Sequence, residues 1–223
     1  MLIEPLLTTR REDGRDIPLL VWRTRRPLRA VSSAPLGGGI GVRRWVLNAT
    51  VPMSYDRDDP AAHLTELARE VGLDGPGVGL LTGVDVGEVL TRTDSGVRVW
   101  ATVGLGTPIN AAAPAAPAAP TAAQRVGTVN IVAWVPARLG DAALVNTVAT
   151  ATEAKAQAIA ELGLPGTGTP TDAVTVLCSP TGPVSAYGGP RSQWGAPLAR
   201  AVHAAVLAVG TNTVVPWSDR LRV

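Results

Sequence analysis

The chain has 223 residues, of which 46% are hydrophobic, and this is enough for one domain with a substantial core. No run of about 18 uncharged apolar residues occurs, and the first residues do not resemble a secretory signal, so we expect neither a membrane span nor a signal peptide. The formal net charge is only +2 and the arginines are scattered, which argues against a nucleic-acid partner.

The N-terminal segment predicts β-strands. Short apolar runs cover 16–23 and 28–34, and basic turn residues separate them. A glycine-rich loop follows at 35–41, and the next apolar run, at 43–51, predicts a third strand.

A helix is predicted at 59–72. Asp59 can cap its N-terminus, Pro60 suits the first helical position, and Gly72 ends it. The apolar stripe of this helix consists of Leu64, Leu67, Ala68 and Val71. His63 lies off the stripe, so we expect a solvated surface histidine.

The middle of the chain predicts an antiparallel meander. Its strands cover 77–84, 86–93 and 97–104, and the sequence TDSG supplies the turn before the last strand. The Ala/Pro-rich tract that follows, 107–125, has no periodic apolar face. We expect it to be an exposed, flexible loop inside a single domain that spans 1–223.

The remainder alternates strand and helix. Strands are predicted at 127–135 and 173–178, and helices at 141–162 and 196–209. Helices that follow strands in this order predict helices packed on a sheet. The expected fold is therefore α+β: a single domain with a mixed, largely antiparallel sheet flanked by helices, in a sandwich-like arrangement.

Cys178 is the single cysteine and lies in an apolar strand segment. Such a cysteine is typically a small buried hydrophobic residue. Without a second cysteine an internal disulfide cannot form, which fits a reducing compartment. We therefore expect a cytoplasmic protein.

Lysine occurs once among the 20 lysine and arginine residues, as Lys155. Because an ammonium and a guanidinium differ in shape and in hydrogen-bond geometry, this residue is a candidate functional group. It falls within the apolar stripe of the helix predicted at 141–162. Since burying an unpaired ammonium is costly, Lys155 must meet a carboxylate, reach an edge or line a cavity. A structural ion pair and a role in proton transfer are both open.

Glu153 lies roughly opposite that stripe. The same side of the helix carries the small residues Ala142, Ala149, Ala156 and Ala160. A smooth alanine face permits close packing, which would bury Glu153, whereas an unpacked face would leave it as a surface glutamate.

Sequence motifs for metals and nucleotides are absent. The chain has no HxH, HExxH or CxxC, no P-loop, and neither GxGxxG nor GxSxG. We therefore expect no catalytic metal and no tightly bound cofactor.

Five segments, in order, resemble the adenosylcobinamide amidohydrolase family. They are SSAPLGGG (32–39), RRWVLNATVPMSYD (43–56), GTVNIVAWV (127–135), TATEAKAQAIAELGL (150–164) and TGTPTDAVTVLC (167–178). They spread across most of the chain, and TATEAK followed by TGTxTDAV is the specific combination. One departure is Gly37, which stands where the family usually has an asparagine before its glycines.

The resemblance implies hydrolysis of the amide that joins aminopropanol to the corrin ring of adenosylcobinamide, giving adenosylcobyric acid for cobalamin salvage. The cobalt corrinoid is then a small-molecule substrate and not a cofactor. The alternative is a non-catalytic protein that binds or senses a corrinoid. A second copy of the chain, in a homo-oligomer, is left open as a partner.

Amide hydrolysis needs an activated nucleophile, a stabilised oxyanion and a proton for the leaving amine. Two assignments are open. In the first, Glu153 or Asp172 is the base for a water, and Lys155 stabilises the oxyanion or protonates the leaving nitrogen. In the second, Ser33 is the nucleophile and Lys155 is its base.

The candidates for substrate binding are hydroxyl, amide and glycine backbone groups within the resembling segments. They are Ser32, Gly38, Gly39, Asn48, Asn130, Thr150, Thr167, Thr169 and Thr171. Such groups can hydrogen-bond the amides of a corrinoid, or they can serve turns and strand ends.

Overall fold

The structure, a computed structural model, describes residues 4–12, 14–106, 108–114 and 127–210. The main strands are β1 (Leu6–Glu12), β2 (Arg15–Ser32), β3 (Gly39–Thr50), β4 (Gly77–Thr82), β5 (Leu90–Asp94), β6 (Val97–Val103), β7 (Val129–Val135) and β9 (Ala173–Cys178). The helices are α1 (Pro60–Glu70), α2 (Asp141–Glu161) and α3 (Gly195–Leu207), with a short 3-10 turn, η1 (Val86–Glu88).

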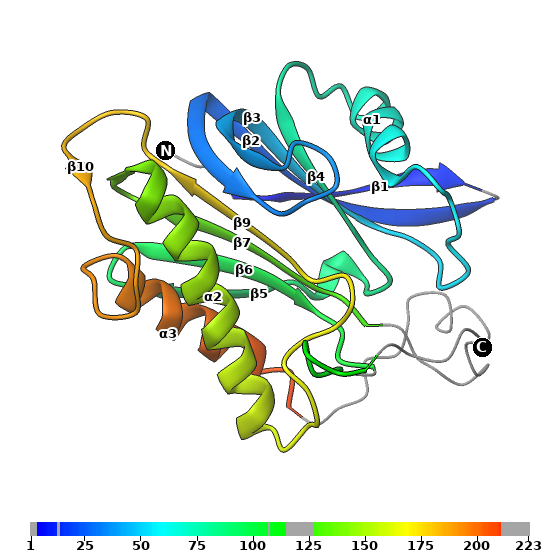
Figure 1. The fold of residues 1–223 in the computed structure, drawn as a ribbon. Helices are drawn as coiled ribbons and strands as arrows, with labels where there is room; N and C mark the ends of the chain where they lie inside the picture. Colours follow the sequence, from blue (N-terminus) through cyan, green and yellow to red (C-terminus); the bar gives the residue numbers. More distant parts are fainter. Residues whose placement is uncertain (1–3, 13, 107, 115–126, 211–223) are drawn as a thin grey trace.

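The main strands form one eight-stranded mixed sheet in the order β4–β3–β2–β9–β7–β6–β5, with β1 paired to β2 (Figure 1). Within the described residues of this sheet, parallel pairing occurs only between β3 and β4 and between β7 and β9. The short strands β8 (Arg138–Leu139) and β10 (Val184–Ser185) make a second, two-stranded sheet.

The large sheet bends so that two layers of strands pack face to face, with helices on both outer sides (Figure 1). Between the layers, Trp22 of β2 meets Trp100 of β6 edge to face, with ring centroids 6.0 Å apart. The helix α1 packs Leu64 and Leu67 on the outer side of β2 and β3. The helices α2 and α3 cover β6, β7 and β9 on the other outer side. This arrangement confirms the predicted sandwich-like α+β fold.

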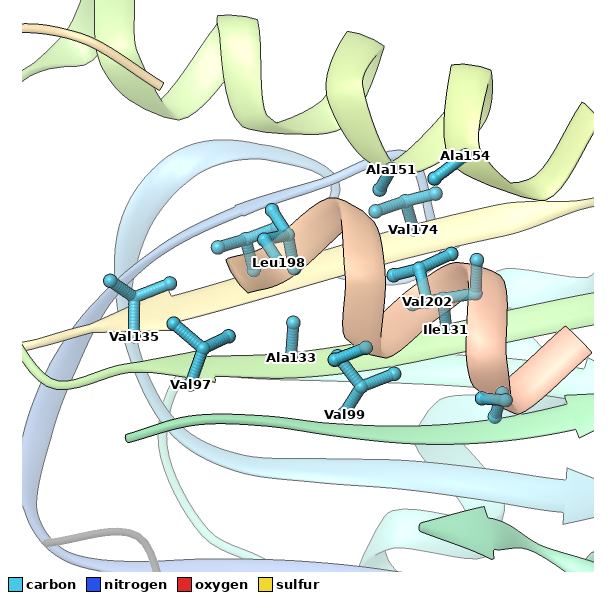
Figure 2. Close-up of a cluster of buried hydrophobic side chains, with 14 of the residues drawn as sticks. Val97, Val99, Ile131, Ala133, Val135, Ala151, Ala154, Val174, Leu198 and Val202 are labelled. Carbon is cyan, nitrogen blue, oxygen red and sulfur yellow. The ribbon is translucent and has the colours of Figure 1, made fainter. Parts of the chain in front are cut away.

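The outer core beneath α2 and α3 shows how side-chain alternation sorts the two faces of a strand. Figure 2 shows Ile131, Ala133 and Val135 of β7 directed at the helices, where Leu198 and Val202 of α3 meet them. Because successive strand residues point to opposite faces, the even-numbered residues of β7 point between the two layers. Asn130 is one of these inward residues.

The apolar runs 16–23 and 28–34 belong mainly to one strand, β2, so the prediction of two separate strands was wrong. The register with β3 shifts between Arg23 and Leu28, but pairing continues on both sides of the irregularity. The same edge of β2 pairs first with β1 and then, at 29–32, with β9. One long, bent strand therefore serves both layers.

The predicted meander is confirmed only for the pairing of β5 with β6, and the first residues of the strand predicted at 86–93 form η1 instead. Their turn has positive φ at Ser95 (47°) and Gly96 (84°), as a type I′ hairpin requires. In contrast, β4 runs parallel to β3, and α1 provides the crossover between them. Alternation reveals the two faces of a strand but not its partner, which is why the sequence misplaced β4.

The other predicted helices and strands are confirmed, with small differences at their ends. The Ala/Pro-rich tract 107–125 lies mostly outside the described residues. Of its described part, 108–114, Ile109 exchanges backbone hydrogen bonds with the loop before β9, donating to the Gly168 carbonyl at 2.8 Å. In the described parts of the chain, no helix is long and apolar enough to cross a membrane.

Candidate active site

A cavity of about 560 Å³ is lined by residues from both sheet layers. One layer contributes Leu80, Leu81 and Thr82 of β4. The other contributes Asn130 of β7, Ala173 of β9 and Asp172, the residue before β9. Ser33, just after β2, and Tyr55, in the segment between β3 and α1, complete its polar lining together with Thr128 and Thr171.

Asp172 lies immediately before β9 and binds the single lysine of the chain. The Nζ of Lys155 on α2 donates to Asp172 Oδ2, and the two side chains are only 8% and 12% exposed. Lys155 is not among the residues that line the cavity, so it reaches Asp172 from the α2 side. Of the three outcomes left open for Lys155, the structure shows the first: the ammonium is buried and meets a carboxylate.

Three further donors hold the Asp172 carboxylate. The Thr169 N–H donates to Oδ2 at 3.0 Å, while the Thr169 hydroxyl and the Val129 N–H donate to Oδ1 at 2.5 and 2.9 Å. With Lys155, each carboxylate oxygen accepts two hydrogen bonds, which fills its usual capacity. Because two of the donors are backbone groups, the orientation of the carboxylate is fixed by the fold.

Gly168 leaves the space that this arrangement needs. A Cβ at this position would collide with both Lys155 Nζ and Asp172 Oδ2. The TGTPTD segment therefore wraps tightly around the ion pair, and any side chain at position 168 would require Lys155 or Asp172 to move.

Ser33 follows the pairing of β2 with β9 and lines the same cavity as Asp172. Its N–H donates to the Val174 carbonyl and its Oγ accepts from the Val174 N–H, both at 3.0 Å. Ser33 is exposed and lines the cavity, so its hydroxyl hydrogen can be donated to a bound molecule. Among the described residues, Ser33 and Lys155 share no hydrogen bond, because Lys155 is bonded to Asp172.

Asn48 and Asn130 form a buried amide pair between the layers. Asn130 Nδ2 donates to Asn48 Oδ1 at 3.0 Å and to the Leu81 carbonyl at 2.9 Å, and Asn48 Nδ2 donates to the Thr102 hydroxyl at 3.0 Å. Both amide hydrogens of Asn130 are thus in use. Since Asn130 is 2% exposed and lines the cavity, its Oδ1 is the atom that can accept from a ligand.

The threonines of the TGTPTD segment have three different surroundings. Thr171 lines the cavity and its hydroxyl lies 2.7 Å from that of Thr128. Thr169 is buried and serves Asp172. Thr167 lies outside the cavity lining, and its hydroxyl accepts from the Ala111 N–H at 3.1 Å.

Glu153 and Thr150 lie away from Asp172. Both line a separate depression of about 420 Å³ that also includes Gln157 and His203. Glu153 is exposed, so its alanine-rich face is a solvated one. Thr150 is buried and donates to the Gly188 carbonyl at 2.9 Å, which ties α2 to the loop before α3.

Ser32, Gly38 and Gly39 also lie outside the cavity lining. The Ser32 hydroxyl lies 2.7 Å from that of Thr175 and accepts from the Ala34 N–H, so it serves the end of β2. The Gly38 carbonyl accepts from the Arg43 guanidinium at 3.3 Å. At the neighbouring Gly37, whose φ is 71°, a Cβ would collide with the Gly77 carbonyl, which explains why a glycine stands there.

His63 is buried, with 4% exposure, so the prediction of a surface histidine was wrong. Tyr55 covers it: the two rings stack with centroids 5.4 Å apart, and His63 Nδ1 lies 3.2 Å from the Tyr55 hydroxyl. Helix periodicity could not reveal this, because the cover comes from the segment before α1. The sequence signal that could have revealed it is Tyr55 itself, which lies within the resembling segment RRWVLNATVPMSYD.

The surroundings of this pair favour uncharged rings. Burial lowers the pKa of His63 below its ordinary value, and the nearby positive charges of Arg57 and Arg10 lower it further. Burial raises the pKa of Tyr55. At neutral pH a neutral imidazole therefore faces a neutral phenol.

Within the described parts of the chain, no three His, Cys, Asp or Glu side chains come close enough to hold a metal ion. The expectation of no catalytic metal and no tightly bound cofactor stays a prediction.

The sequence profile of the adenosylcobinamide amidohydrolase family matches residues 5–213. The chain belongs to this family. An adenosylcobinamide amidohydrolase of Methanosarcina mazei is 32% identical over 179 residues, which cover 76% of this chain and 84% of the relative. One of Halobacterium salinarum is 39% identical over 166 residues, covering 71% of this chain and 70% of the relative. The matched region includes the whole cavity and the Lys155–Asp172 pair.

Proposed function

We propose that this protein hydrolyses the amide bond between aminopropanol and the corrin ring of adenosylcobinamide. The family and the names of both relatives support this activity. The structural observation that carries it is Asp172, the only carboxylate among the described residues that line the cavity. A fixed carboxylate beside a hydroxyl and an amide carbonyl suits the activation of a water and the binding of an amide.

In the proposed reaction, Asp172 accepts a proton from a water that attacks the amide carbonyl. The new C–O bond gives a tetrahedral intermediate, whose oxyanion the Ser33 hydroxyl stabilises. The proton then passes from Asp172 to the nitrogen, the C–N bond breaks, and aminopropanol leaves as the amine. One water is consumed, and the corrinoid keeps the carboxylic acid.

For this step Asp172 must release one of its four hydrogen bonds. Two come from the backbone N–H groups of Val129 and Thr169, which cannot rotate away. The Thr169 hydroxyl can do so, because it turns about a single side-chain bond. We propose that the attacking water replaces this hydroxyl on Oδ1.

Lys155 acts through Asp172 and is a positioning residue in this scheme. Its ammonium holds Oδ2, while the reaction uses Oδ1. This differs from a serine nucleophile with Lys155 as its base, which would require the buried ion pair to break first.

Asn130 is proposed to orient the substrate. Its free Oδ1 accepts a hydrogen bond from an amide N–H of the corrinoid, and Asn48 and Thr102 keep that oxygen facing the cavity. The cavity volume of about 560 Å³ is typical of pockets for small ligands, and a corrin with its side chains is much larger. The cavity therefore takes one amide-bearing arm of the corrinoid.

The corrinoid is the substrate of the proposed reaction. We place the reaction in the cytoplasm, because a chain with one cysteine suits a reducing compartment.

The test is to incubate the protein with adenosylcobinamide and to identify aminopropanol and the corrinoid acid by mass spectrometry. In ¹⁸O-labelled water the acid should gain one labelled oxygen. Tight binding of the corrinoid without either product would overturn the proposal and favour a protein that binds or senses a corrinoid.

A further inference from the structure

A second part of the cavity wall comes from the segment between β3 and α1. It is mainly apolar and consists of Val51, Pro52, Met53 and Tyr55, together with Pro60, the first residue of α1. Tyr55 is the one residue of this wall whose side chain can donate a hydrogen bond. The tyrosine is half-buried and belongs to the same cavity as Asp172 and Ser33.

His63 holds the Tyr55 hydroxyl from behind the wall. It does not line the cavity, and its Nδ1 lies 3.2 Å from Tyr55 Oη. The stacked rings, at an interplanar angle of 19°, further restrict the tyrosine. In the described structure, the bond to Tyr55 is the only hydrogen bond of the His63 side chain.

The charged residues around the pair are engaged elsewhere. Arg10 donates to the Thr50 carbonyl at 3.1 Å and pairs with Glu12 at 2.9 Å. Arg57 pairs with Glu66 at 2.8 Å. Among the described residues, no carboxylate therefore forms a hydrogen bond or an ion pair with His63. The polar contact of its side chain is with Tyr55, which faces the cavity.

We propose that Tyr55 contacts the corrinoid through its hydroxyl and that His63 is a positioning residue for Tyr55. This inference rests on the proposed function and makes the Tyr55 hydroxyl a group that determines substrate specificity. A phenol has one donor and two acceptor sites, so one bond to His63 leaves others for a ligand. A single fixed hydroxyl on an apolar wall suits a corrinoid, whose hydrocarbon edge carries polar amide arms.

Tyr55→Phe tests the contact, and the chain offers a matched control. Tyr187 is the only other tyrosine and is 78% exposed, so Tyr187→Phe removes the same atom from the surface. We expect Tyr55→Phe to raise the KM for adenosylcobinamide by about tenfold, the value of one hydrogen bond, with kcat changed by less than about threefold. Tyr187→Phe should match the wild-type protein in both constants. Equal KM values for Tyr55→Phe and Tyr187→Phe would overturn the inference.

The role of His63 is tested by rescue and by coupling. His63→Asn keeps an amide near the position of Nδ1 and should retain most of the affinity, whereas His63→Leu should raise KM as Tyr55→Phe does. In the Tyr55→Phe background, His63→Leu should add nothing further to KM. Fully additive effects would show that His63 does not act through Tyr55. His203, which is part-exposed and pairs with Glu161, gives the control His203→Asn.

Binding separates this inference from the proposed reaction. The visible absorption of the corrinoid reports its binding to the Asp172→Asn variant, with and without Tyr55→Phe, whether or not turnover occurs. If the wild-type protein binds adenosylcobinamide without hydrolysing it, the proposed hydrolysis is overturned. In that case, about tenfold weaker binding by the Tyr55→Phe variant would still support the contact between Tyr55 and the corrinoid. Unchanged binding, or none to either protein, would overturn the contact.

Discussion

The ammonium of Lys155 on α2 donates to the carboxylate of Asp172 just before β9, and both side chains are almost fully withdrawn from solvent. A buried charge without its partner is strongly destabilising, so each residue depends on the other. The pair joins a helix on the outside of the sandwich to the cavity between its layers. It thereby couples the fold to the proposed site.

Lys155→Arg should lower kcat/KM by at least about 100-fold while the protein stays folded. The larger, planar guanidinium cannot replace the ammonium in the space that Gly168 leaves, and the Asp172 carboxylate would shift. Steady-state kinetics with adenosylcobinamide and circular dichroism check both parts. Turnover close to that of the wild-type protein would remove Lys155 from the mechanism.

Lys155→Met should destabilise the protein by about 3 kcal/mol, because it leaves the buried Asp172 charge without its ammonium. Urea unfolding followed by circular dichroism measures the free energy of unfolding. Asp94→Asn, which breaks the exposed pair with Arg200, is the control and should cost much less. Equal losses would mean that burial of the Lys155–Asp172 pair has no energetic consequence.

Asp172→Asn should abolish hydrolysis, because the amide cannot take a proton from water. It should also destabilise the protein, because the Lys155 ammonium loses its carboxylate. Corrinoid binding should stay measurable at temperatures where circular dichroism shows the variant to be folded. Glu153→Gln, in the separate depression on α2, should keep wild-type kinetics. The comparison decides between the two carboxylates that the sequence offered as bases. An inactive Glu153→Gln with an active Asp172→Asn would reverse the assignment.

Ser33→Ala should lose about 100- to 1,000-fold in kcat, as expected for the loss of one hydrogen bond to an oxyanion. A serine nucleophile would instead lose nearly all activity and would form a covalent acyl-enzyme in the wild-type protein. Rapid quenching followed by intact-protein mass spectrometry distinguishes the two. Detection of a corrinoid acyl group on Ser33 would contradict attack by water.

The folded protein should lose stability as the pH falls below about 6.5, the ordinary pKa of histidine, through the contribution of His63. Burial lowers the pKa of His63 in the folded state, with Arg57 and Arg10 adding to the effect and Glu12 and Glu66 opposing it. Between the two pKa values the unfolded chain binds more protons, so protonation favours unfolding until the pH is below the folded pKa. Urea unfolding measured from pH 7.5 to 5.0 should show a smaller loss of unfolding free energy for His63→Asn than for the wild-type protein. Parallel curves for the two proteins would show that His63 does not contribute.

The local periodicity of the sequence correctly predicted the three helices and most strands. It also placed Lys155 in a buried stripe, since 3.6-residue spacing alone decides which helix residues share a face. It failed where the answer depends on a partner distant in the chain. The pairing of β4 with β3 and the continuity of β2 across its basic residues are such cases.

For the proposed site as well, the sequence predicted some features and not others. The pattern TATEAK followed by TGTPTDAV, with the other resembling segments, pointed to the family and to Lys155, Asp172 and Ser33. The segments could not show that Glu153 and Thr150 lie in a different depression, or that Tyr55 covers His63. Residues close in sequence need not share a site, because neighbouring positions on a helix point in different directions.

The sequence by itself therefore determined the family, the helices, most strands and the place of its single lysine within an apolar helix stripe. These follow from local spacing and from short motifs. Only the tertiary structure decided that Asp172 is the partner of Lys155, that four donors fill its carboxylate, and that Asn130 and Tyr55 line the same cavity. These relations arise from the packing of two sheet layers, which brings together residues that no local pattern connects.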